Sequence, residues 1–187
     1  MDLTGTAGLP PLAEEHHVCA ECPMAYADAR VESAVTALLG VPEEVHAAVG
    51  AVAPAHRRVR PAPATWSVTE YACHIRDVFA TFTIRLHRTS TEDAPALEPM
   101  FADLRAVRFR YNEADPGVVL GELEAHVAGF LDEMAATTDW DRVATRRPEE
   151  VRTARWLVRH ALHEARHHVH DITAVGAAVA RGENPAR

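Results

Sequence analysis

The sequence contains no lysine: all 19 basic residues are arginines, against 27 acidic residues, and the formal net charge is −8. Binding to a phosphate backbone needs a surplus of basic side chains on one face, so this balance argues against a nucleic-acid partner. No stretch approaches the roughly 20 consecutive apolar residues that span a bilayer, which argues against a membrane partner. Residues 1–17 also lack the basic start and apolar run of a secretion signal. These absences together predict a cytoplasmic protein.

Cysteine is scarce as well, and there is no sustained alternation of apolar and polar residues that would indicate β-strands. Three cysteines without a leader indicate reduced thiols or metal ligands before they indicate disulfides. Ala, Leu, Glu and Arg instead recur at helical spacing through a chain of 187 residues, which is enough for one domain with its own core. We expect an all-α fold, a four-helix bundle with one long crossover connection over residues 91–114. The amphipathic helices are predicted to begin near Asp28, Ser67, Asp115 and Thr153.

Local signals support these boundaries. Ser67–Glu70 has the pattern of a capping box, and Asp115 precedes a proline at the first helical position. The first helix is predicted to break into two pieces at Gly40–Pro42, because proline removes an intrahelical hydrogen bond. Residues 1–26, with two adjacent prolines and no periodicity, are predicted to form an extended arm that contains a Cys-x-x-Cys pair. The bundle should then occupy residues 27–182.

The stretch HEARHHVHD, residues 163–171, raises the question of which side chains hold a metal. At about 100° per residue, one core-facing stripe of the last helix includes Leu157, Ala161, Glu164, His168 and Ile172. An ionised glutamate and a histidine in a core are costly unless they are paired, protonated or bound to a metal. The i, i+4 spacing of Glu164 and His168 suits one shared ion. We therefore predict this pair as metal ligands, with a hydrogen-bonded pair without metal as the alternative.

The other histidines of the stretch lie roughly 100° away from the core-facing stripe. We expect His163, His167 and His170 to lie on a solvated face. A third ligand should come from another helix, and His74, about one turn into the capped helix, is the candidate. A lone histidine at that position could also be purely structural.

Two stretches are similar to a known family. Residues Trp66–Ile75 (WSVTEYACHI) resemble the W-S-x-x-E-x-x-x-H-I/L entry into the second helix of the DinB/YfiT-like superfamily. Glu164-x-x-x-His168-x-x-Asp171-Ile172 resembles the H/E-x-x-x-H-x-x-Q/D-I/L pattern of its fourth helix. The order and separation of the two stretches, together with the expected bundle, cover most of the chain. This superfamily includes mycothiol-dependent maleylpyruvate isomerases and bacterial thiol transferases.

The resemblance implies a divalent metal, often zinc or nickel, held by His74, Glu164 and His168. An open coordination position would activate a water or the sulfur of a low-molecular-weight thiol such as mycothiol, because a metal stabilises the thiolate. Glutamate at position 164, in place of the more frequent histidine, matches the mycothiol-isomerase variant. The sequence ends shortly after the expected bundle, without the extra C-terminal domain of those isomerases, which argues against that particular reaction.

The N-terminal arm contains candidate ligands for a second metal. His16-x-x-Cys19-x-x-Cys22 has knuckle-like spacing, and structural zinc usually has four protein ligands. Cys73 could complete the set, because the helical count points it away from the core, where the arm could cover it. The predicted second site is Cys19, Cys22, Cys73 and either His16 or His17. A redox pair and inert thiols are the alternatives.

Two classes of function follow from these features. The first is a metal-dependent thiol S-transferase that acts on a small molecule, with a hydrolase or isomerase on the same site as its neighbour. The second is a non-catalytic metal- or ligand-binding stress protein, which could act as a homodimer. The sequence assigns no general base, and the candidates are Tyr71, Asp77, Tyr111 and Asp171.

Overall fold

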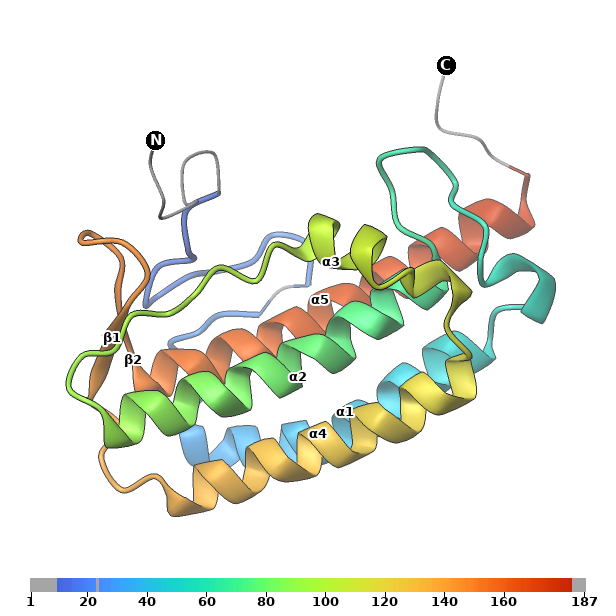
Figure 1. The fold of residues 1–187 in the computed structure, drawn as a ribbon. Helices are drawn as coiled ribbons and strands as arrows, with labels where there is room; N and C mark the ends of the chain where they lie inside the picture. Colours follow the sequence, from blue (N-terminus) through green and yellow to red (C-terminus); the bar gives the residue numbers. More distant parts are fainter. Residues whose placement is uncertain (1–9, 23, 183–187) are drawn as a thin grey trace, which may run out of the picture.

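The protein is a bundle of four long helices in a computed structural model that describes residues 10–22 and 24–182 (Figure 1). The long helices are α1 (Val31–Gly50), α2 (Val68–Thr91), α4 (Pro116–Ala136) and α5 (Ala154–Ala180). The predicted four-helix bundle is confirmed. No helix in the described part of the chain combines the length and the apolar character needed to cross a membrane.

The order of the helices around the bundle places α2 beside α5. Helices α1 and α2 each pack against both α4 and α5, so α1 and α2, which follow one another in the chain, lie diagonally opposite (Figure 1). Residues 51–67 connect the end of α1 to the start of α2 across the bundle and include the short 3-10 helix η1 (Pro54–His56). The long connection between α2 and α4 contains α3 (Ala102–Arg108) and the 3-10 helix η2 (Tyr111–Glu113).

The predicted starts of α2, α4 and α5 are confirmed by their capping bonds, whereas α1 begins at Val31, three residues after the predicted Asp28, without a side-chain cap. Ser67 and Glu70 form the capping box of α2, and the Asp115 carboxylate accepts hydrogen bonds from two backbone N–H groups of α4. At the start of α5 the Thr153 hydroxyl accepts from the N–H of Trp156 at 3.1 Å. These bonds satisfy donors that the first turn of a helix leaves without partners.

The prediction that α1 breaks near Pro42 is wrong, because the helix runs without interruption from Val31 to Gly50. Its buried positions continue across the proline: Ala34, Leu38, Val41, Val45 and Val49. Most helical stability in proteins comes from packing of the apolar face, and here the packing outweighs the loss of one hydrogen bond.

A two-stranded sheet, which the sequence did not predict, joins α4 to α5. Strands β1 (Val143–Thr145) and β2 (Val151–Thr153) pair antiparallel, and β2 leads directly into α5. With three residues each, the strands are too short to produce an alternating pattern that can be recognised.

The N-terminal arm, predicted as residues 1–26, lies against this sheet and α5 (Figure 1). Residues 1–9 and 23 of the predicted arm lie outside the described residues. The carbonyl oxygen of Ala13 accepts from the Trp156 indole N–H at 3.1 Å and from Arg152 Nε at 2.7 Å. The Glu15 carboxylate accepts from the Thr153 N–H at 2.7 Å. The arm is therefore bonded to the beginning of α5.

One glycine makes a close helix contact that can be tested. A Cβ atom added at Gly176 of α5 would lie 2.4 Å from Val52 Cγ2, just beyond α1. Because valine is stiff at χ1, Gly176→Ala should lower the free energy of unfolding by about 1–3 kcal/mol, as measured by urea denaturation. Gly129→Ala in α4 is the control: its Cβ meets nothing within 4 Å, and the substitution should stabilise by about 0.4–1 kcal/mol. Equal effects of the two substitutions would contradict the close contact.

Candidate metal centre

The candidate ligand from α2 is positioned by the chemistry at the start of that helix. Ser67 Oγ accepts from the Glu70 N–H at 3.2 Å, and Glu70 Oε2 accepts from the Ser67 N–H at 2.9 Å. Arg60 adds an ion pair to the Glu70 carboxylate at 2.5 Å. His74 follows one turn later, on the side of α2 that packs against α5, and it is buried.

Helix α5 brings Glu164 and His168 to the same point. Glu164 Oε2 lies 3.4 Å from His74 Nε2 and 3.5 Å from His168 Nε2, and the ligand atoms of the three residues lie within 4.8 Å of one another. Both distances exceed the usual 2.7–3.2 Å of hydrogen bonds to oxygen. Two ligand atoms about 2.0–2.1 Å from a tetrahedral zinc ion lie roughly 3.4 Å apart. The three side chains are thus spaced as ligands of one small ion.

Neighbouring groups hold the two imidazoles in position. The second nitrogen of His168, Nδ1, lies 2.7 Å from Asp171 Oδ2, which fixes the ring with Nε2 toward Glu164. The Tyr71 ring packs against His168 and the Trp66 ring against His74, with centroids 5.3 and 5.1 Å apart. A carboxylate on the far nitrogen is the usual outer partner of a metal-bound histidine. Asp171, proposed from sequence as a possible base, is therefore committed to orienting His168.

The charges in the cluster suit a cation. Burial by itself would raise the pKa of Glu164, but His160, His168 and His74 hold that pKa well below its ordinary value. Burial also opposes the charged form of His168, yet the hydrogen bond to Asp171 and the nearby Glu164 carboxylate raise its pKa to about 9. Burial lowers the pKa of His74. At a pKa of about 9 His168 carries a proton at neutral pH, which a bound metal would replace. One ionised oxygen ligand and two neutral imidazoles are then a donor set that accepts zinc or nickel.

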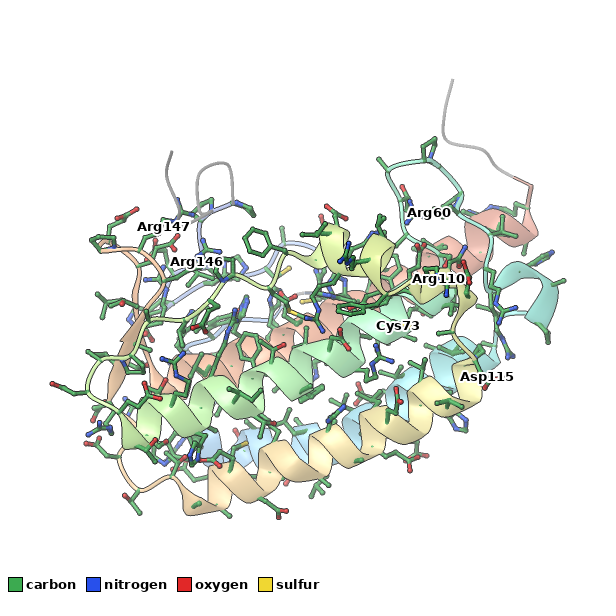
Figure 2. The ribbon with its side chains drawn as sticks, viewed as in Figure 1. Arg60, Cys73, Arg110, Asp115, Arg146 and Arg147 are labelled. Carbon is green, nitrogen blue, oxygen red and sulfur yellow. The ribbon has the colours of Figure 1, made fainter. Side chains whose placement is uncertain are left out.

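The cluster opens into a pocket of about 640 Å³ between α2, α5, the α2–α4 connection and the arm. His74, Glu164 and His168 all line it. Its other walls are mainly apolar and include Pro11, Leu12, Val78, Phe82, Met100 and Leu104. Two arginines, Arg85 and Arg146, also line the pocket, and Figure 2 shows Arg146 close to the arm.

Arg85 and Arg146 have different partners. Arg85 is 8% exposed, and its Nη2 donates to the Glu98 carbonyl oxygen at 2.6 Å. Its guanidinium lies 4.8 Å from the centroid of the Phe82 ring. Arg146 is paired with the Glu150 carboxylate at 2.7 Å, whereas no described carboxylate forms an ion pair with Arg85. Burial lowers the pKa of Arg85 to about 10, so it still carries its charge at neutral pH.

Sequence reasoning missed Arg85 and also His160, a second titratable residue that lines the pocket. Its ring stacks on Trp156 with centroids 4.4 Å apart, and its Nε2 lies 3.7 Å from Glu164 Oε1. The Tyr26 hydroxyl lies 2.7 Å from His160 Nδ1. Burial lowers the pKa of His160 to about 4, which makes it neutral at physiological pH. The available signal was its position four residues before Glu164, which continues the i, i+4 series of the candidate ligands.

The structure does not assemble the predicted second site. The ligand atoms of Cys19 and Cys22 converge with those of two α5 histidines, and neither Cys73 nor His16 belongs to that group. Cys73, which Figure 2 labels on α2, is fully buried, and its sulfur contacts the Tyr111 carbonyl oxygen at 3.7 Å. The prediction that the arm covers Cys73 and brings Cys19 and Cys22 to it is wrong, because the α2–α4 connection covers that side of α2. His16 is exposed.

The two histidines that do meet the cysteines are His163 and His167. The prediction that these two residues lie on a solvated face is wrong, since His163 is buried and His167 is half-buried. His170 is exposed, as predicted. The arm is the cause, because it lies over that face of α5. His17, the alternative ligand from the arm, packs its ring against His163 with centroids 5.3 Å apart and is not part of the group.

The thiol of Cys19 is held in a polar setting. Burial raises its pKa, but hydrogen bonds from the backbone N–H groups of Cys22 and Glu21 and from His167 bring the pKa below its ordinary value. Such bonds favour the thiolate, which is the form that binds metals.

The remaining candidates for a general base do not line the pocket. Asp77 accepts hydrogen bonds from Arg105 and from the Tyr111 hydroxyl, and these contacts join α2 to the α2–α4 connection. Burial raises the pKa of Tyr71 to about 12, so its hydroxyl is protonated at neutral pH. None of Asp77, Tyr111 and Tyr71 is a pocket-lining residue.

The chain is similar to a known protein family and to a solved structure. A family model described as the DinB superfamily matches residues 37–172. Among solved structures the chain is similar to YfiT from Bacillus subtilis, with a TM-score of 0.75 and 18% identity over 92% of this chain and 94% of that one. YfiT is described as a probable metal-dependent hydrolase with an unusual four-helix bundle topology. No curated protein matches the sequence. The structural likeness shows that the two proteins share a fold.

Proposed function

The chain belongs to the DinB superfamily, and from this premise we propose that it is a metal-dependent thiol S-transferase that acts on a small molecule. The observation that carries the proposal is the spacing of the candidate ligands around one point, at 3.4 and 3.5 Å, at the edge of a pocket of about 640 Å³. Three protein ligands beside an open pocket are the arrangement of catalytic metal sites, whereas structural sites are closed by four.

His74, Glu164 and His168 would hold the ion, zinc or nickel. When bound, such an ion stabilises a thiolate at neutral pH and polarises a bound oxygen. The rest of the site acts through position and charge: Asp171 keeps His168 Nε2 toward Glu164, and the Tyr26 hydroxyl lies 2.7 Å from His160 Nδ1, to which we assign its hydrogen. The neutral imidazole of His160 then carries its hydrogen on Nε2, as a donor toward Glu164 and the pocket.

The pocket walls support a substrate with an apolar body and an anionic group. Valine, phenylalanine, methionine and leucine side chains supply the apolar surface, and Arg85 supplies a buried positive charge that has no carboxylate partner among the described residues. A buried charge without a counter-ion is costly, so an incoming anion would lower that cost. A low-molecular-weight thiol such as mycothiol would be the sulfur donor, and glutamate at position 164 supports this choice because the mycothiol-isomerase variant of the superfamily carries it.

A metal-dependent hydrolase is the second candidate, favoured by the likeness to YfiT, which is described as a probable hydrolase of this kind. The same three ligands would serve, with water in place of the thiol as nucleophile. The two candidates differ in the product. A transferase yields a sulfur adduct of the substrate, and a hydrolase yields the cleaved substrate without sulfur.

Metal analysis and product analysis test the proposal together. We expect His74→Ala to lose one metal equivalent relative to wild type, by plasma mass spectrometry on tag-free protein. The exposed His87→Ala on the same helix should lose none. Wild type loaded with zinc or nickel is then incubated with mycothiol, cysteine or water and with electrophilic and ester substrates that carry a carboxylate. Metal-dependent formation of a thiol adduct supports the transferase, metal-dependent cleavage alone supports the hydrolase, and unchanged metal content in His74→Ala would overturn both.

A further inference from the structure

Backbone contacts on either side of the two arm cysteines bring the residues that flank them together. The Cys19 N–H donates to the Met24 carbonyl oxygen at 3.0 Å, and Val18 pairs with Ala25 in an isolated β-bridge. The loop between these bonds presents Cys19 and Cys22 on the same side, toward α5. Cys19 is buried and Cys22 is partly buried, and both are free thiols.

The opposing ligands lie one turn apart on α5. The ligand atoms of Cys19, Cys22, His163 and His167 all lie within 4.8 Å of one another. Cys19 Sγ is 3.6 Å from His167 Nδ1. Around a tetrahedral zinc ion, a sulfur at about 2.3 Å and a nitrogen at about 2.0–2.1 Å lie roughly 3.6 Å apart. The observed separation is therefore that of two ligands of one zinc ion.

The outer partners leave one nitrogen of each histidine for this point. His163 is 7% exposed, its Nδ1 lies 3.2 Å from the Tyr26 hydroxyl, and its Nε2 is buried without a hydrogen-bond partner among the described atoms. His167 directs Nε2 at carboxylates, with Glu21 Oε2 at 3.4 Å and Asp171 Oδ2 at 3.7 Å, which leaves Nδ1 beside Cys19. A buried imidazole nitrogen without a partner is costly, and a metal would satisfy it.

We propose that Cys19, Cys22, His163 and His167 form a second metal site, a closed structural zinc site that fastens the N-terminal arm to α5. Two thiolates and two imidazoles are a preferred ligand set of structural zinc, and four protein ligands leave no position for a substrate. Adjacent residues of HEARHH then serve two sites. The i, i+4 pair at 163 and 167 faces the arm, and the pair at 164 and 168 faces the pocket, about 100° around the helix.

This second site, formed by Cys19, Cys22, His163 and His167 and called the clamp below, also affects the pocket. Residues 10–13, which precede the cysteine loop in the arm, line the pocket beside the three-ligand cluster. Zinc at the clamp would hold this wall in place through the loop at 19–22. The inference does not depend on the proposed chemistry, because the two sites use different ligands.

Cobalt substitution distinguishes the two sites. Metal-free, reduced full-length protein loaded with cobalt(II) should bind two equivalents and show a thiolate-to-cobalt charge-transfer band in the near ultraviolet. Cys22→Ser and His163→Ala should each lose one equivalent and most of the band. His74→Ala should lose one equivalent and keep the band, and the exposed His170→Ala should keep both equivalents. A missing band in wild type, or a band that persists in Cys22→Ser, would overturn the clamp. Failure of the pocket site alone would instead leave wild type with one equivalent and the full band, and His74→Ala would then lose no metal.

A measurement on wild type avoids variants that fail to fold. Titration of zinc-loaded protein with an organomercurial that reacts with thiols should release one equivalent of zinc, detected with a metallochromic dye, and leave the second equivalent bound. Release of no zinc, or an isolated protein in which Cys19 and Cys22 are joined in a disulfide after purification under reducing conditions, would overturn the proposal.

Discussion

Glu164→Gln is expected to abolish metal binding at the pocket site and to lower turnover by more than the roughly 10–100-fold that loss of an outer partner costs. Glu164 Oε2 is the atom common to both short contacts of the site, with His74 and His168. It is also the only negative charge among the three ligands. Glutamine has the same shape and keeps the packing, so the substitution removes charge and ligand strength with little effect on the fold.

The measurement is zinc affinity by chelator competition, together with initial rates on whichever substrate the product analysis identifies. Glu124→Gln on α4, an exposed glutamate, is the control and should match wild type. Because the clamp holds its own ion, the expected metal content of Glu164→Gln is one equivalent below wild type. Retention of the full metal content and activity would contradict the assignment of Glu164 as a ligand.

The sequence predicted well those features that depend on local chemistry. The starts of α2 and α5 follow from Ser67, Glu70 and Thr153, whose side chains bond to backbone groups within three residues. The approach of Glu164 and His168 follows from helical geometry once the helix is known. These features can be predicted without knowing the rest of the fold.

The errors concern positions that distant segments cover. A helix in a bundle is expected to bury one face, and on that assumption Cys73 should lie away from the core, under the arm, and His163 should face solvent. The α2–α4 connection covers Cys73, and the arm covers His163. Neither segment has periodicity that reveals where it packs. The cysteines of the arm lie beside histidines that are more than 100 residues away in sequence. The spacing of residues within the arm could not identify these partners.

The two candidate metal sites are connected through a short chain of polar side chains. The Tyr26 hydroxyl lies between His160 Nδ1 at 2.7 Å and His163 Nδ1 at 3.2 Å, and the Tyr26 residue is fully buried. The shorter contact assigns the hydroxyl hydrogen to His160, and His163 then donates from Nδ1, which leaves its Nε2 with a free lone pair. The arm thus contributes to the orientation of one pocket histidine and one clamp histidine through the same tyrosine.

Asp77→Ala is expected to lower the free energy of unfolding by about 3 kcal/mol, the lower end of the cost of breaking a buried ion pair. Asp77 is 5% exposed and accepts from Arg76 Nε at 2.8 Å, from Arg105 Nε at 3.0 Å and from the Tyr111 hydroxyl. Its loss leaves the buried Tyr111 hydroxyl without this acceptor. The estimate is at the lower end because Arg105 is partly exposed and Arg76 keeps an ion pair with Glu122.

The pH dependence of this effect has a definite sign. Burial would raise the pKa of Asp77, but the Tyr111 hydroxyl, Arg105 and Arg76 lower it below its ordinary value. A carboxyl group with a depressed folded-state pKa contributes stability above its unfolded pKa of about 3.9, and that contribution is lost as the pH falls through the folded pKa. Urea denaturation should therefore show a constant difference between wild type and Asp77→Ala from about pH 5 to 8 and a shrinking difference below about pH 4. Asp132→Ala, at an exposed position of α4, is the control and should stay within about 0.5 kcal/mol of wild type. A difference that grows on acidification would mean that Asp77 is protonated in the folded protein, and the ion pairs would then not hold the connection to α2.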